Sequence, residues 1–94
     1  MKFRGASVIL GIKNRLKLPS KDLETTGPFE RKMAYGNSPK RVVVTYIFDE
    51  KYGKEKLRLE RGFFKQEMEF NNDDQAVHII KVASDKIIQM LEKE

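Results

Sequence analysis

The stretch FNNDDQ, residues 70–75, separates two hydrophobic periodicities in this chain. Before it, apolar residues fall on alternate positions, as in a strand with one buried face. After it, they recur every three or four residues, as on one face of a helix. Asn and Asp side chains accept hydrogen bonds from the free N–H groups of a first helical turn. The stretch therefore predicts a junction between a sheet and a capped helix over about residues 73–92.

Upstream of this junction, the apolar pattern predicts strands at about residues 3–13, 29–35, 40–49 and 55–70. In the first of them, two glycines also argue against a helix. Dense turn formers at residues 36–39 predict a hairpin between the second and third strands. The predicted fold class is α+β: an antiparallel meander of about four strands, then one long amphipathic helix packed on one sheet face. The whole chain, residues 1–94, is expected to form one domain.

Within residues 55–70 the apolar phase slips by one position, and Gly62 lies at the slip. Either Gly62 forms a β-bulge in one long strand, or Arg61-Gly62 is a tight turn that opens a further strand. We favour the bulge, because Arg is a poor first residue for a tight hairpin turn.

The strand at 40–49 is apolar on both faces, which is typical of the middle of a sheet covered on both sides. One helix covers one face, so Val43 and Ile47 are expected to point away from it, together with Phe63. A homodimer through this second face or through an edge strand would explain such a patch. Two alternatives are an irregular flap formed by residues 14–40 and a platform on which bases or a peptide stack.

The composition excludes several classes of protein. The chain has no Cys, so it has neither disulfides nor thiolate metal sites. It has no apolar run long enough to cross a bilayer, and its first residues lack the features of a signal peptide. We expect a cytoplasmic protein that does not associate with membranes.

The net charge of +5 is unevenly distributed along the sequence. Residues 1–40 hold nine Lys or Arg against three acids, whereas residues 61–94 hold five against seven. Such a gradient can attract a polyanion, or it can join two subunits head to tail. Ordinary solubilising charge is the simpler explanation.

Lys13, Arg15 and Lys17 alternate within the basic half. In an extended chain they would point the same way, about 6.6 Å apart, a spacing that can follow the phosphates of a single strand. Arg4 and Lys21 would extend this track, as would Lys2. The competing interpretation is a solvated edge strand whose charges prevent edge-to-edge aggregation.

Signatures of catalysis are missing. The sequence has no nucleophile elbow, phosphate-binding loop or dinucleotide fingerprint, and its single histidine, His78, is expected on the exposed helix face. The acidic and amide residues at 71–74 lack the spacing of a calcium loop. We therefore expect no enzyme, no metal and no cofactor. The leading hypothesis is a small nucleic-acid-binding module of single-stranded or sequence-independent preference. The alternative is a protein–protein adaptor or inhibitor that acts through the second sheet face or an edge strand.

Overall fold

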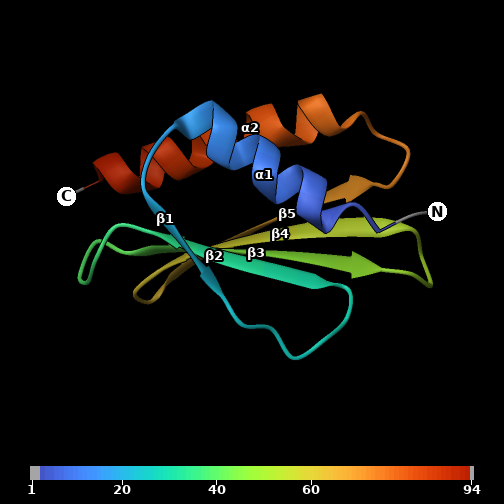
Figure 1. Cartoon of the computed structure of the whole chain (residues 1–94), viewed down its shortest axis with the longest axis horizontal. Helices are drawn as coiled ribbons and strands as arrows, with labels where there is room; N and C mark the ends of the chain where they lie inside the picture. The colour runs from blue at the N-terminus through green and yellow to red at the C-terminus, as the bar shows by residue number, and fades with distance from the viewer. Residues whose placement is uncertain (1–2, 94) are drawn as a thin grey trace.

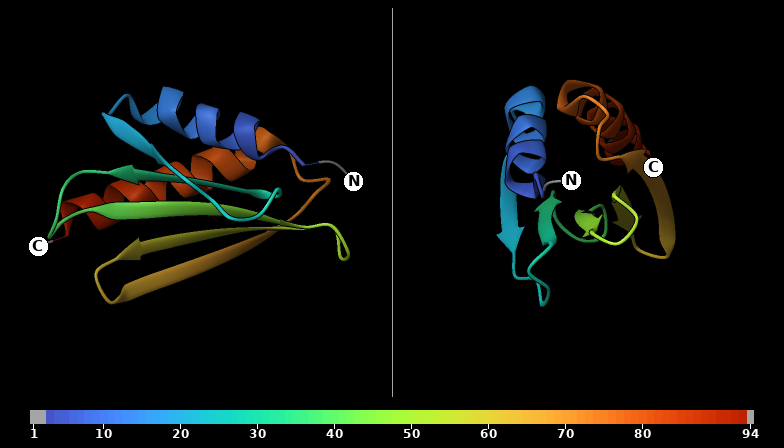
Figure 2. Two further views of the ribbon diagram at one scale, coloured as in Figure 1. Left: turned by 60° about the horizontal axis from the view of Figure 1, so that its bottom comes forward. Right: turned by 90° about the vertical axis from the view of Figure 1, so that its right-hand side faces the viewer.

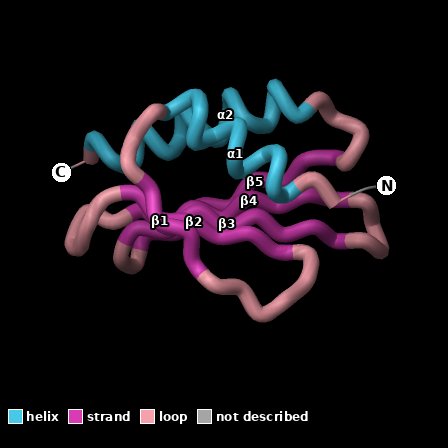
Figure 3. Tube along the Cα trace, viewed as in Figure 1, coloured by secondary structure: helices cyan, strands magenta, loops and turns pink. Residues whose placement is uncertain are grey.

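A computed structural model describes residues 3–93 of the chain. Five strands form one antiparallel sheet, and a helix precedes and follows it (Figure 1; Figure 3). In chain order the elements are α1 (Gly5–Leu16), β1 (Ser20–Leu23), β2 (Glu30–Tyr35), β3 (Val42–Asp49), β4 (Lys54–Arg61), β5 (Phe64–Asn71) and α2 (Ala76–Glu92). The strands lie in the sheet in the order β1-β2-β3-β4-β5, so each strand is joined to the next by a hairpin. The predicted α+β meander with a packed C-terminal helix is confirmed, with five strands in place of four.

Both helices lie on the same face of the sheet and run in the same general direction (Figure 2). Strand β3 is central, and its alternate residues Val42, Val44, Tyr46 and Phe48 are buried beneath the helices. Helix α2 adds a buried stripe at helical spacing to this core. The stripe consists of Ile79, Ala83, Ile87 and Met90.

The N-terminus of α2 differs from the predicted cap. Its N-cap residue is Gln75, which makes no capping hydrogen bond through its side chain. The Asp74 carboxylate instead accepts a hydrogen bond from the Asn71 backbone N–H at 3.0 Å. The acidic stretch thus closes the turn between β5 and the helix, because an aspartate side chain serves a turn as readily as a helix start.

The strand predicted over residues 3–13 is wrong, because Gly5–Leu16 forms helix α1. The buried residues Val8, Ile9 and Ile12 fit a helical face, whereas Leu10, which in a strand would share a face with Val8 and Ile12, is 57% exposed. In a segment of only twelve residues, alternation and helical spacing share several positions, so the hydrophobic pattern alone does not separate them.

The two glycines of α1 lie where side chains of neighbouring residues come too close to leave room for a Cβ atom. A Cβ atom on Gly5 would lie 2.9 Å from Tyr46 Cδ1, and one on Gly11 would lie 2.2 Å from Ile80 Cδ1. Glycine costs a helix about 1 kcal/mol relative to Ala. At these two positions close packing against β3 and α2 offsets that cost.

The phase slip at Gly62 is a turn between two strands, and the bulge favoured from the sequence is wrong. Arg61 pairs with Phe64, and the two central residues of the hairpin are Gly62 and Phe63. Gly62 has φ of +60°, whereas Phe63 is not among the described residues of positive φ. Positive φ at the first central position alone is the pattern of a type II′ turn. Gly is therefore the first turn residue, in place of Arg61.

The second face of the sheet is open among the described residues. Residues 14–40 do not fold over it as a flap, because residues 20–23 and 30–35 join the sheet as β1 and β2 (Figure 2). Val43 and Ile47 lie on this open face, as predicted, and are partly buried. Charged residues neighbour them in register: Glu60 stands opposite Val43, and Glu30 and Lys56 flank Ile47. Among the described residues, these charges interrupt the apolar surface around Val43 and Ile47.

Candidate nucleic-acid interface

The meander brings four distant segments to one end of the molecule. In Figure 1 the α1–β1 connection, the β2–β3 turn, the β4–β5 turn and the C-terminus of α2 all lie towards the left. The β1–β2 and β3–β4 loops and the β5–α2 connection lie at the opposite end. This arrangement follows from the topology, because successive hairpins of an antiparallel sheet alternate between its two ends.

The charges divide between these two ends. The first end carries eight Lys or Arg and one acid, and we call it the basic end; it comprises residues 15–21, 36–41, 61–65 and 89–93. The opposite end carries three Lys or Arg and seven acids, and it comprises residues 3–5, 24–30, 49–55 and 71–77. The structure therefore has a charge gradient along its longest dimension, 38 Å. It differs from the gradient along the sequence, because both ends combine segments from the N-terminal and C-terminal halves of the chain. A field of this kind attracts polyanions to one end.

Phe63 stands at the tip of the β4–β5 hairpin with its side chain entirely exposed, at 108% of the reference area. Its chain neighbour Phe64 is 48% exposed, and the Lys93 ammonium lies 4.6 Å from the centre of the Phe64 ring. Large apolar side chains normally lose water contact on folding. The fully exposed ring of Phe63 at the basic end is therefore available to contact a ligand.

The hairpin that carries Phe63 is anchored at its base. The Arg61 guanidinium donates hydrogen bonds to the backbone carbonyls of Met90 and Lys93. These carbonyls belong to the C-terminal end of α2, where free C=O groups and the negative end of the helix dipole favour a cation. The turn geometry and this cap together hold the Phe63 backbone in a defined position.

A groove of about 430 Å³ runs between the two turns of the basic end on the open face of the sheet. Arg41 and Lys32 contribute positive charge to it, and Glu60 contributes the opposing acid. Gly62 forms part of its lining, so the groove reaches the residue next to Phe63. The remaining lining residues are Ser38, Pro39 and Val43.

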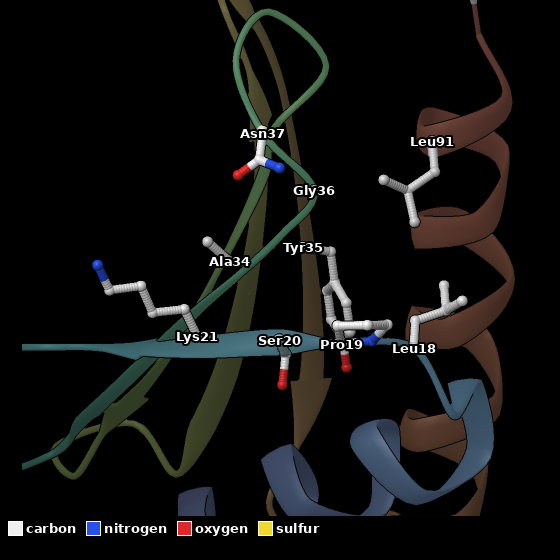
Figure 4. Close-up of a pocket in the computed structure, with 9 residues that line it drawn as sticks. All are labelled: Leu18, Pro19, Ser20, Lys21, Ala34, Tyr35, Gly36, Asn37 and Leu91. Carbon is white, nitrogen blue, oxygen red and sulfur yellow. The ribbon is translucent and has the colours of Figure 1, made fainter.

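A second hollow, of about 450 Å³, lies where α1 meets β1 (Figure 4). Leu18 and Leu91 line it on the side of the helices, and Lys21 and Asn37 extend on the other side of β2. The Tyr35 hydroxyl beneath it is buried, and burial raises the pKa of Tyr35, an effect that the neighbouring Ser20 hydroxyl opposes. This hollow offers apolar walls with a cation at the rim.

The basic residues predicted from the sequence do not form one extended track. Arg4 is engaged by the buried Glu55, and the Lys13 ammonium pairs with Asp22 Oδ1 at 2.5 Å. Because residues 5–16 are helical, the side chains of Lys13, Arg15 and Lys17 do not point the same way, as they would in an extended chain. Lys2 lies outside the described residues.

Three of the predicted cations do lie at the basic end. Arg15 and Lys17 are exposed at the C-terminus of α1, and Lys21 is exposed on β1 beside the second hollow. Sequence reasoning missed five further cations there, contributed by residues in or beside the two turns and by the C-cap of α2. They are Lys40, Arg41, Arg61, Lys65 and Lys93. If Gly62 and Phe63 had been recognised in the sequence as a two-residue turn, the hairpin that carries Arg61 and Lys65 would have been predicted.

The predicted interface residues are dispersed. Val43 and Ile47 lie on the open face, whereas Phe63 stands at the tip of the β4–β5 hairpin. Among residues 3–93, no group of three acidic or histidine side chains has a geometry that could hold a metal ion. The His78 ring packs edge-on against Phe70, with their centres 6.2 Å apart. Neither helix of the described chain is long and apolar enough to span a membrane.

Comparison of the chain with models of protein families, with curated proteins and with solved structures finds no match.

Proposed function

We propose that the basic end binds single-stranded nucleic acid without sequence preference, with Phe63 as a stacking platform for one base. The observation that carries the proposal is the fully exposed Phe63 ring on an anchored hairpin at the basic end of the molecule. Proteins that bind single strands combine these two elements: cations that follow the phosphates, and aromatic rings on which bases stack.

The two elements contribute different parts of the affinity. Stacking one base on an aromatic ring is worth about 1–3 kcal/mol and tolerates any base. Each phosphate neutralised by a Lys or Arg releases counterions, so affinity falls steeply with salt. Phe63 needs an unpaired base, because the faces of bases inside a duplex are already stacked. A single strand is therefore favoured over a duplex.

The proposed binding residues replace part of the predicted set. Arg15, Lys17 and Lys21 stay in it, and Lys40, Arg41 and Lys65 join them. Arg4 and Lys13 leave it because their charges are paired within the fold. Arg61 is assigned to anchoring the hairpin, since its guanidinium caps α2.

A single tryptophan tests the stacking directly, because the chain contains none. We expect the fluorescence of a Phe63→Trp variant to be quenched when a short oligothymidylate is added at low salt. Tyr52→Trp is the matched control, since Tyr52 is 65% exposed at the opposite end. Quenching at Tyr52→Trp alone, or at neither position, would contradict the proposal. In a separate titration, Phe63→Ala should weaken binding about ten-fold, within the range expected for one stacked base.

Charge removal tests the phosphate contacts. We expect Lys40→Ala with Arg41→Ala to weaken binding to all sequences about equally. The slope of log K against log salt should become shallower by about 0.7 for each phosphate that is no longer neutralised. Lys51→Ala with Lys54→Ala removes the same charge from the opposite end and should leave the slope unchanged. Equal effects of both pairs would indicate attraction by net charge alone. Binding that is undetectable at low salt would refute the proposal.

A further inference from the structure

The two edges of the sheet differ in how well they are protected. Strand β1 has four residues and follows Pro19, so it offers little backbone to a partner. Strand β5 has eight residues, Phe64–Asn71, with neither Pro nor Gly, and its register with β4 is continuous, without a bulge. Natural sheets usually shorten, bulge or cover such an edge, because its unpaired N–H and C=O groups can bind another strand. Strand β5 has none of these three protections. Its charged residues Lys65, Glu67 and Glu69 discourage indiscriminate pairing, so a partner strand must match these charges.

The hydrogen-bonding groups of β5 that face outwards can be identified from the ladder. The Asn72 N–H donates to the Gly53 carbonyl at 2.9 Å, so these two residues form a hydrogen-bonded pair. Such pairs alternate along an antiparallel ladder. The backbone groups of Phe64, Gln66, Met68 and Phe70 therefore point at β4. Those of Lys65, Glu67 and Glu69 point to the open edge, whereas the Asn71 N–H and carbonyl on the same side are hydrogen-bonded to Asp74.

We propose that two copies of the chain associate through antiparallel pairing of their β5 strands about a two-fold axis at Glu67, which joins the two sheets into one. In this register residues 64–70 of one protomer pair with residues 70–64 of the other. Its hydrogen-bonded pairs are formed by the residues whose backbone groups face the edge. Lys65 of each protomer stands opposite Glu69 of the other, which gives two cross-strand pairs of opposite charge.

The neighbouring registers are less favourable. Centring the axis on Met68 places Glu67 opposite Glu69 twice, and like charges directly opposite each other are destabilising. Centring it on Gln66 limits the overlap to residues 64–68. The proposed register does bring two Glu67 side chains together. Each Glu67 is held at 3.0 Å by Arg58 of its own β4, and this contact lowers the pKa of Glu67.

Two further properties of the fold favour this arrangement. Antiparallel protomers place the basic end of each beside the acidic end of the other, so the long-range fields attract. On the helix side of the sheet, Phe64 of one protomer stands opposite Phe70 of the other, which removes more of the half-exposed Phe64 from water. Because one strand edge buries little area, the association should depend on concentration.

Sedimentation equilibrium on the whole chain without nucleic acid tests the proposal. The average mass is expected to rise from 11.0 kDa towards twice that value as the concentration increases from about 10 to 500 µM. Lys65→Glu alone and Glu69→Lys alone should each weaken dimerisation at least ten-fold, because each creates two like-charge pairs. The double variant restores two opposite-charge pairs and should recover the dimer. Lys81→Glu, at an exposed position of α2 outside both charged ends, is the control and should leave it unchanged.

Amide hydrogen exchange gives an independent measurement. The N–H groups of Lys65, Glu67 and Glu69 should become protected as concentration rises, whereas the amides of β1 should not. A chain that stays monomeric at 500 µM would refute the proposal. A dimer that both single substitutions leave intact, or that the double variant fails to restore, would place the interface elsewhere. Protection of these amides only on adding an extended peptide would identify the edge as a site for another protein.

Discussion

Arg4 and Glu55 lie 51 positions apart and form a two-bond ion pair beneath the first turn of α1. Arg4 Nε donates to Glu55 Oε1 at 2.8 Å, and Nη2 donates to Oε2 at 2.7 Å. The Glu55 carboxylate is fully buried and also accepts a hydrogen bond from the Tyr46 hydroxyl. This network connects α1 to β3 and β4, so it fixes the N-terminal helix on the sheet.

The first prediction concerns this ion pair. Arg4→Ala should lower the free energy of unfolding by about 3 kcal/mol, because it leaves the Glu55 carboxylate buried without its cation. Denaturant unfolding measures the loss. Adding Glu55→Leu removes the buried charge as well and should recover part of the stability. If Arg4→Ala costs less than about 0.5 kcal/mol, the pair is not formed as described.

The second prediction concerns alkaline pH. Burial, reinforced by the hydrogen bond to Glu55, raises the pKa of Tyr46 well above its ordinary value of 10.0. The folded state therefore favours the neutral phenol, so its stabilising contribution is complete below pH 10. That contribution is lost as pH rises above 10, because the unfolded chain ionises first. Unfolding free energies measured from pH 8 to 11.5 should fall more steeply for the parent chain than for Tyr46→Phe. Identical slopes would contradict the prediction.

The third prediction concerns the close approach of the two helices. Gly11→Ala should destabilise the fold by about 1 kcal/mol, because overpacking against Ile80 exceeds the gain in helix propensity. Ile80→Val removes the Cδ1 atom that lies 2.2 Å from the new Cβ. The same glycine substitution should then cost less in the Ile80→Val background, and a double-mutant cycle measures this coupling. Additive effects would show that the helices do not meet at these residues.

The elements that could be predicted from the sequence are those whose hydrophobic pattern fits only one type of secondary structure. Helix α2 was recognisable because its apolar stripe is long, and Ile87 at its centre is fully buried. Strand β3 was recognisable because apolar residues occupy both of its faces. Helix α1 was misassigned because its glycines weaken helix propensity. The reason for those glycines, close contact with Tyr46 and Ile80, is tertiary.

The candidate site was predictable only in part, because it is assembled by topology. A surplus of basic residues was visible in the N-terminal part of the sequence. Lys40, Lys65 and Lys93 belong to three separate segments, and only the alternation of hairpins brings them to one end. Arg4 and Lys13 illustrate the opposite error, since a charge count does not show which cations are paired inside the fold.

The last prediction concerns Gly62, which directs the hairpin carrying Phe63. Gly62 has φ of +60°, and a Cβ atom there would meet nothing within 4 Å. Any cost of Gly62→Ala therefore comes from the backbone alone, and about 1–3 kcal/mol is expected for an L-residue held at a sparsely populated positive φ. Gly62→Asn should cost less, because Asn occurs more readily than Ala at the positive-φ positions of such hairpin turns.

Gly27→Ala is the matched control for this substitution. Gly27 has no positive φ, and the nearest atom to its new Cβ would be Glu30 Cδ at 3.4 Å. A surface change of this kind should stay within about 0.5 kcal/mol. Thermal or denaturant unfolding of the three variants gives the comparison. If Gly62→Ala were as neutral as Gly27→Ala, the turn would not need positive φ. Phe63 would then lack a fixed position, and the stacking platform proposed for the basic end would lose its structural basis.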